Sequence, residues 1–120
     1  MEARCTANTV VQPLVTVPLN LKCIVDSIFL DNRSGAAITV QLQDNFTEDV
    51  SAGPTPIAAP TARIALPFQQ TVPANQGYNA DVNSLQSRYG EQGLVILEQM
   101  GAICSVIEPL CDIVVYYHVE

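Results

Sequence analysis

Apolar and polar residues alternate along much of this chain. In segment 61–82, TARIALPFQQTVPANQGYNADV, apolar residues stand at nearly every second position up to Pro73, and the alternation resumes after a Pro/Asn/Gly turn. Successive side chains of an extended strand point to opposite faces of a sheet, whereas a helix would scatter these apolar residues around its axis. The segment therefore predicts two strands, 61–72 and 78–82, joined by a turn.

The same rhythm recurs before and after this segment. Further strands are expected at 14–17, 22–30, 37–44, 94–100 and 112–120, with loops or connections at 45–60, 83–93 and 101–111. Strand 22–30, KCIVDSIFL, has apolar residues on both faces, so it should be central or at an interface. No segment of ten or more residues has apolar residues at helical spacing. The pattern predicts an all-β, jelly-roll-like antiparallel β-sandwich of about seven or eight strands.

The first residues differ from the rest of the chain. Segment 1–20 alternates poorly and contains Pro13 and Pro18. Proline cannot donate a hydrogen bond within a sheet, so strand 14–17 should lie at an edge or against another chain. We expect an extended N-terminal arm, 1–13, followed by one β-sandwich domain, 14–120.

Charge narrows the range of partners. The net charge is −7, which argues against nucleic acid and anionic membranes, because both require clustered Lys and Arg. Only 14% of the residues are charged, against about 25% in a typical soluble chain. No apolar run reaches the roughly 20 residues of a membrane span, and the start lacks the pattern of a secretory signal. A weakly charged exterior favours a protein that associates with other subunits over an isolated monomer.

The residues that usually carry catalysis are sparse, so no enzyme activity, catalytic residue, cofactor or metal site is expected. His118 is the only histidine and lies opposite the apolar face of its strand, which favours a surface or contact role over that of a general base. In the pair Tyr116–Tyr117 the two side chains face opposite ways, so one should be in the core and the other at a contact surface. Nucleotide-binding, serine hydrolase and zinc protease motifs are missing from the sequence.

The four cysteines, without a signal for export, are expected to be free thiols that behave as small buried hydrophobic residues. They are Cys5, Cys23, Cys104 and Cys111. Cys104 and Cys111 bracket a short segment, so an oxidising environment leaves a disulfide between them as an alternative.

One acidic cluster is a candidate cation site. Asp44, Glu48 and Asp49 gather near a predicted strand end, and hard oxygen ligands suit calcium. The commoner role of Asp and Asn at such a position is to bond the backbone of a turn. A calcium- or glycan-binding module remains the alternative function, although the chain has no tryptophan to stack on a sugar.

Four segments taken together resemble a known class of proteins. CIVDSIFLDNRSGAAITVQLQD, TVPANQGYNADV, RYGEQGLVILEQMG and DIVVYYHVE are similar to the small β-sandwich virion proteins of tailed bacteriophages, in the head-decoration or cement class. The resemblance covers about 22–120 and rests on turn signals. It implies a homo-oligomer, with a trimer favoured, that binds the major capsid protein on the capsid surface after assembly in the host cytoplasm. A tail, baseplate or adhesin-type sandwich is the alternative within this class.

Overall fold

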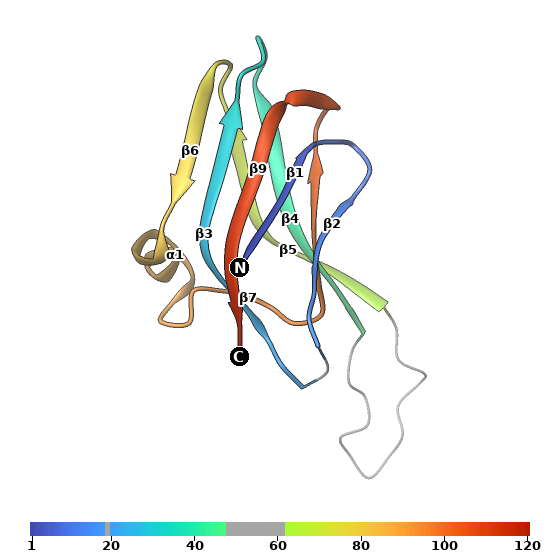
Figure 1. Ribbon diagram of the computed structural model, residues 1–120, viewed down its shortest axis with the longest axis vertical. Coiled ribbons are helices and arrows are strands. Elements are labelled where there is room, and N and C mark those ends of the chain that lie inside the picture. Colours follow the sequence, from blue (N-terminus) through green and yellow to red (C-terminus); the bar gives the residue numbers. More distant parts are fainter. Residues whose placement is uncertain (19, 48–61) are drawn as a thin grey trace.

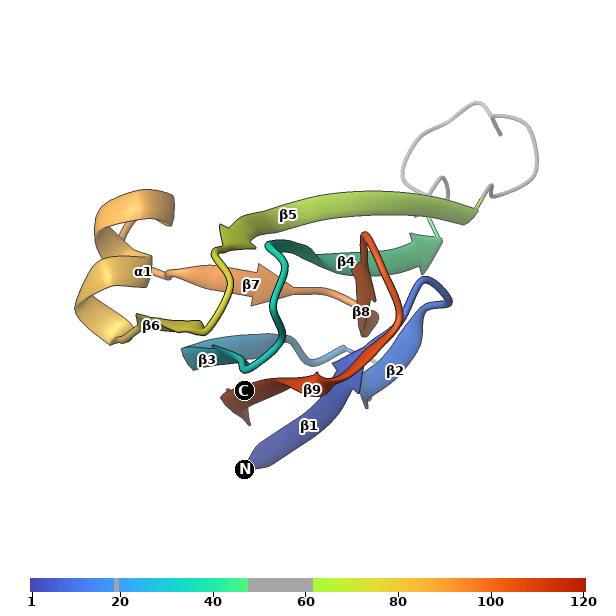
Figure 2. The same cartoon turned by 90° about the horizontal axis from the view of Figure 1, so that it is seen from above.

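The computed structural model describes residues 1–18, 20–47 and 62–120, which form two antiparallel sheets packed face to face (Figures 1 and 2). Sheet A has the order β1 (Glu2–Ala7), β9 (Glu108–Val119), β3 (Cys23–Asn32) and β6 (Gln76–Ala80), and β7 (Leu94–Ile96) also pairs with β3. Sheet B has the order β2 (Gln12–Thr16), β8 (Gln99–Cys104), β4 (Ile38–Thr47) and β5 (Ala62–Val72). This is a jelly roll, so the predicted fold class is confirmed.

The core lies between the sheets and is built from alternate residues of each strand. In β4, Ile38, Val40 and Leu42 are buried, and in β9, Ile113 and Val115 are buried. Phe68 of β5, Met100 of β8 and Leu30 of β3 are among its largest side chains. Full burial of such a side chain contributes about 1.5–3 kcal/mol. The period of two therefore locates the buried face of the long strands correctly.

The N-terminal segment is part of the sandwich, contrary to the expected arm. Residues of β1 pair with β9 from Glu2 opposite Tyr116 to Ala7 opposite Glu108, and the amino group of Met1 donates to the carbonyl oxygen of Tyr117 at 2.9 Å. Pro13 lies in β2, at the edge of sheet B, as its chemistry requires. The alternation in β1 is hard to detect because its inward residues, Ala3, Cys5 and Ala7, are small.

A helix replaces part of the expected loop 83–93. In α1 (Val82–Tyr89), the carboxylate of Asp81 accepts a hydrogen bond from the backbone N–H of Ser84 at 2.8 Å, which caps the first turn. Gly90 ends the helix with a φ of 95°, a conformation that favours glycine. Gly90 and Gly93 thus mark the end of the helix and the turn after it.

The last third of the chain is divided into strands differently from the prediction. The predicted strand 94–100 is interrupted between β7 and β8, and the predicted connection 101–111 is strand except for a short turn. The chain passes from β7 in sheet A to β8 in sheet B at this interruption. A strand that changes sheets cannot continue its ladder, which explains the break and the one additional strand it produces.

Candidate functional site

The outer face of sheet A carries three neighbouring apolar side chains at its centre. Phe29 of β3 lies opposite Val114 of β9, and Tyr116 is the next outward residue of β9. The rings of Phe29 and Tyr116 meet edge to face, with centroids 5.7 Å apart and planes at 88°. Phe29 is 39% exposed and Tyr116 38% exposed. We call Phe29, Val114 and Tyr116 the aromatic patch.

Charged residues surround the aromatic patch. Arg4 of β1 lies opposite Val114, and Glu2 lies opposite Tyr116. The guanidinium of Arg4 contacts the Glu2 carboxylate at 2.8 Å, and that of Arg33 contacts Asp31 at 2.9 Å. Exposed pairs of this kind contribute about 0–1 kcal/mol to stability, so their main effect is on which partner can approach. An apolar centre with a charged rim is the anatomy of a protein interface.

The sequence predicted one of the two exposed rings of the aromatic patch. Of the tyrosine pair, Tyr117 packs against the core and Tyr116 is exposed, as predicted. Strand β3 is central, between β9 and β6, but its outer face at Phe29 is open in the single chain rather than covered. Only pairing with β9 reveals that Phe29 and Tyr116 are neighbours, because they are far apart in sequence.

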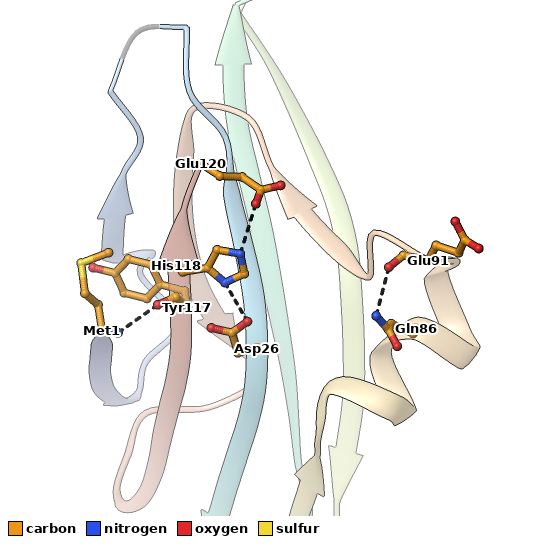
Figure 3. A network of polar contacts seen from close by, with 7 residues as sticks. All are labelled: Met1, Asp26, Gln86, Glu91, Tyr117, His118 and Glu120. Atoms are coloured by element: carbon orange, nitrogen blue, oxygen red, sulfur yellow. Dashed lines mark hydrogen bonds and ion pairs between the residues drawn. The ribbon is translucent and has the colours of Figure 1, made fainter.

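An open groove of about 280 Å³ lies between α1 and sheet A. His118 lines this groove, and Figure 3 shows its side chain between the carboxylates of Asp26 and Glu120. Its Nδ1 is 2.8 Å from a carboxylate oxygen of Asp26, and its Nε2 is 3.5 Å from Glu120. Asp26 is the extra residue at a bulge in β3, between the partners of Tyr117 and Tyr116. The bulge aims this carboxylate at the neighbouring strand.

The opposite wall of the groove comes from α1 and the turn after it. Val82 and Leu85 contribute apolar surface, and the side-chain amide of Gln86 donates to the carbonyl oxygen of Glu91 at 3.1 Å (Figure 3). His118 is exposed, so the predicted surface position is confirmed. The groove combines apolar walls with carboxylates at its mouth, which suits a basic side chain more than an anion.

The carboxylate of Asp44 accepts hydrogen bonds from the backbone and is not free to bind an ion. It is buried and accepts them from the backbone N–H groups of Leu97, Glu98 and Gln99 at 2.8, 3.2 and 3.2 Å. These are the residues at the break between β7 and β8. The backbone-bonding role is therefore confirmed for Asp44, while Glu48 and Asp49 lie outside the described residues. Within residues 1–18, 20–47 and 62–120, no three His, Cys, Asp or Glu side chains are grouped to hold a metal.

All four cysteines are free thiols, as expected. Cys23, Cys104 and Cys111 are buried, and Cys5 packs against the core. Burial is the largest cause of a raised pKa at Cys5, Cys23 and Cys111, to about 11 in each case, and it also raises the pKa of Cys104. Thiols with such pKa values are protonated and poorly nucleophilic near neutral pH. Cys104 and Cys111 form no disulfide in the structure and pack as small apolar residues.

No helix in the described part of the chain has the length and apolar character needed to cross a membrane. Comparison with protein-family models, with curated proteins and with solved structures finds no match to this chain.

Proposed function

We propose that this chain is a structural virion protein, a capsid decoration or cement subunit that binds the major capsid protein and stabilises the head lattice of a tailed bacteriophage. The observation that carries the proposal is the aromatic patch, an exposed apolar centre on the outer face of a jelly roll. The sequence resemblance and the low charge of the chain agree with it. We assign the outer face of sheet A to the capsid shell.

The outer face of sheet B has a different character. The hydroxyls of Thr39 and Thr71 are hydrogen bonded at 2.9 Å, and the amide of Gln41 donates to Gln69 at 3.0 Å. These side chains satisfy one another across β4 and β5 and present an uncharged polar surface. Because their polar groups are already paired, this face gains little from a protein partner. We assign it to solvent.

The patch is small, and its size explains why such a protein would act as an oligomer. Burying the exposed part of Phe29 or Tyr116 contributes about 1 kcal/mol each, since full burial of such a ring is worth about 1.5–3 kcal/mol. One chain therefore attaches weakly through the patch alone. Several linked chains bind a repeating lattice far more tightly, because each further contact is intramolecular.

Co-sedimentation of the purified protein with phage heads that lack it tests this assignment. Replacement of both rings, Phe29→Ser with Tyr116→Ser, should lower binding at least tenfold, because the apolar anchor is lost. The matched control is Gln41→Ser with Gln69→Ser, two exchanges on the outer face of sheet B that should leave binding unchanged.

Circular dichroism melts of both variants establish that each is folded. Heads carrying the wild-type protein should also withstand higher temperature before releasing DNA than heads without it. Equal binding by the patch variant and the wild type would contradict the proposed attachment face. Failure of the wild-type protein to bind heads or to raise their thermal resistance would contradict the proposed function.

A further inference from the structure

The two sheets have open edges, and most of these edges carry a feature that hinders pairing with another chain. In sheet B, β2 contains Pro13, which has no N–H to donate. At the other edge of sheet B, the hydroxyl of Tyr89 donates to the carbonyl oxygen of Pro67 at 2.7 Å. The guanidinium of Arg88 donates to the carbonyl oxygen of Gln69 at 3.4 Å. Helix α1 thus occupies part of the free edge of β5.

Sheet A has one interrupted edge and one continuous edge. Beyond β3 the edge is divided between two short strands, β6 and β7, and β6 leads into α1. At the other end stands β1, whose pairing is with β9. In the described part of the chain no strand pairs with the second edge of β1, which contains no proline. An unhindered edge of this kind is a template for strand addition.

The charges on β1 select a particular partner. Glu2 and Arg4 are successive outward residues, separated by the small residue Ala3. If a second β1 pairs antiparallel about a two-fold axis at Ala3, Glu2 of each chain lies opposite Arg4 of the other. Opposite charges then alternate around a ring of four side chains, which favours pairing.

Other symmetric registers are less favourable. A shift that places the axis at Arg4 sets two arginines opposite each other, and a shift to Glu2 sets two glutamates opposite each other. An axis at Cys5 would leave Glu2 without an opposite charge and would bring the bulge between Thr6 and Ala7 into the pairing. The outward charges are therefore complementary to a second copy of the same strand in one register.

We propose that β1 is the self-association edge of this protein, and that two copies join antiparallel through β1 with Ala3 at the two-fold axis. Sheet A then continues from one chain into the other. In that register Val114 and Arg4 of one chain are in line with Glu2 and Tyr116 of the second copy. The two aromatic patches lie on the same face, on either side of the axis.

This contact makes a dimer, rather than the trimer favoured by resemblance, the first assembly of the free chain. It does not rest on the proposed function, because it concerns the edge of sheet A and not its face. A short strand pair forms a modest interface, so the dimer should appear at high chain concentration. On a lattice, two patches presented on one surface would attach together.

Sedimentation velocity over a range of chain concentrations tests the proposal with four proteins. The wild type should dimerise. Glu2→Arg and Arg4→Glu should each lower the association constant at least tenfold, because each places like charges opposite each other. The double variant, Glu2→Arg with Arg4→Glu, restores the alternation and should dimerise like the wild type.

The four proteins also separate pairing from overall charge repulsion. The double variant keeps the net charge of −7, whereas Glu2→Arg alone makes it less negative. Repulsion between whole chains would therefore make Glu2→Arg associate more strongly than the wild type, and pairing through β1 predicts the opposite. Both side chains are largely exposed and melting temperatures should stay close, so loss of folding does not confuse the result.

Three results would overturn the proposal: a monomeric wild type at every concentration, an association unaffected by the single exchanges, or no recovery in the double variant. The variant with Phe29→Ser and Tyr116→Ser should still dimerise, since its exchanges lie on the face of sheet A. Failure of head binding with an intact dimer would contradict the proposed function and leave this inference standing.

Discussion

Two buried polar side chains fix the turns of this molecule. Asp44 accepts three backbone hydrogen bonds at the break between β7 and β8. The amide of Asn32, fully buried, donates to the carbonyl oxygens of Ala36, Val72 and Pro73 and so joins the turn after β3 to the turn after β5. Each provides partners for backbone groups that the turns would otherwise leave unpaired.

Replacement of Asp44 by asparagine should destabilise the protein. The exchange keeps the size of the side chain but turns one acceptor into a donor that faces backbone N–H groups. The free energy of unfolding should fall by about 1–3 kcal/mol, measured by urea denaturation. Asp31→Asn is the matched control, because Asp31 forms an exposed ion pair with Arg33 and its loss should cost less than about 1 kcal/mol. A wild-type melting temperature that rises with calcium, and no longer rises in Asp44→Asn, would contradict this role.

For single residues, the sequence predicted the kind of interaction that a side chain makes but not the groups that it contacts. Asp44 was interpreted as a residue that bonds the backbone, and the structure confirms this. The Asp26–His118 pair had no local signal, because the two residues are 92 positions apart and meet through pairing of β3 with β9. Chemistry that depends on strand pairing is not visible in residue spacing.

At the scale of elements, long strands follow from their pattern and short elements do not. Strand β4 alternates large apolar and polar residues, and its position was predicted closely. Helix α1 buries only Leu85 among its side chains, so it has no apolar stripe by which to detect it. Its sequence signals are its ends, the capping Asp81 and the terminal Gly90.

The cap of α1 makes helix stability depend on pH. The hydrogen bond from Ser84 lowers the pKa of Asp81 below its ordinary value of 3.8. A carboxyl group with a lowered pKa stabilises the fold above its ordinary pKa, and this contribution is lost as pH falls through the folded value. Asp81→Ala should therefore lower the melting temperature and speed hydrogen exchange in α1 at pH 7, and the difference from wild type should shrink below about pH 4.

Glu91→Ala is the control for this exchange, because Glu91 is exposed and its side chain caps no helix. A deficit in Asp81→Ala that is the same at pH 7 and at pH 3 would show that the carboxylate does not act as a charged cap.

At the scale of the whole molecule, the fold class could be predicted but the strand order could not. Period two and frequent turns indicate a sandwich, yet many strand orders satisfy the same pattern. The jelly roll pairs β1 with β9 and β2 with β8, contacts between the two ends of the chain. The predicted arm was wrong for this reason, since β1 becomes part of a sheet only when the last strand is in place.

The buried and half-buried thiols should make the whole fold sensitive to alkaline pH. Cys5, Cys23 and Cys111 have pKa values of about 11 in the folded chain and an ordinary value of 9.0. A raised pKa stabilises the fold below the ordinary value, and this contribution is lost as pH rises through the folded one. The free energy of unfolding should fall between about pH 9 and 11, and less steeply in Cys111→Ala.

A thiol-reactive disulfide reagent provides a second measurement at pH 8. The native protein should react slowly, and the chain in urea should react at all four cysteines. Rapid reaction of every thiol in the folded protein would contradict their burial.

The central proposal is that the outer face of sheet A binds the capsid shell. A cryo-EM reconstruction of phage particles containing this chain tests it most directly. The account predicts jelly-roll density on the outside of the head, with Phe29 and Tyr116 against the major capsid protein and sheet B toward solvent. Heads without this density, or density in which the aromatic patch points to solvent, would contradict it.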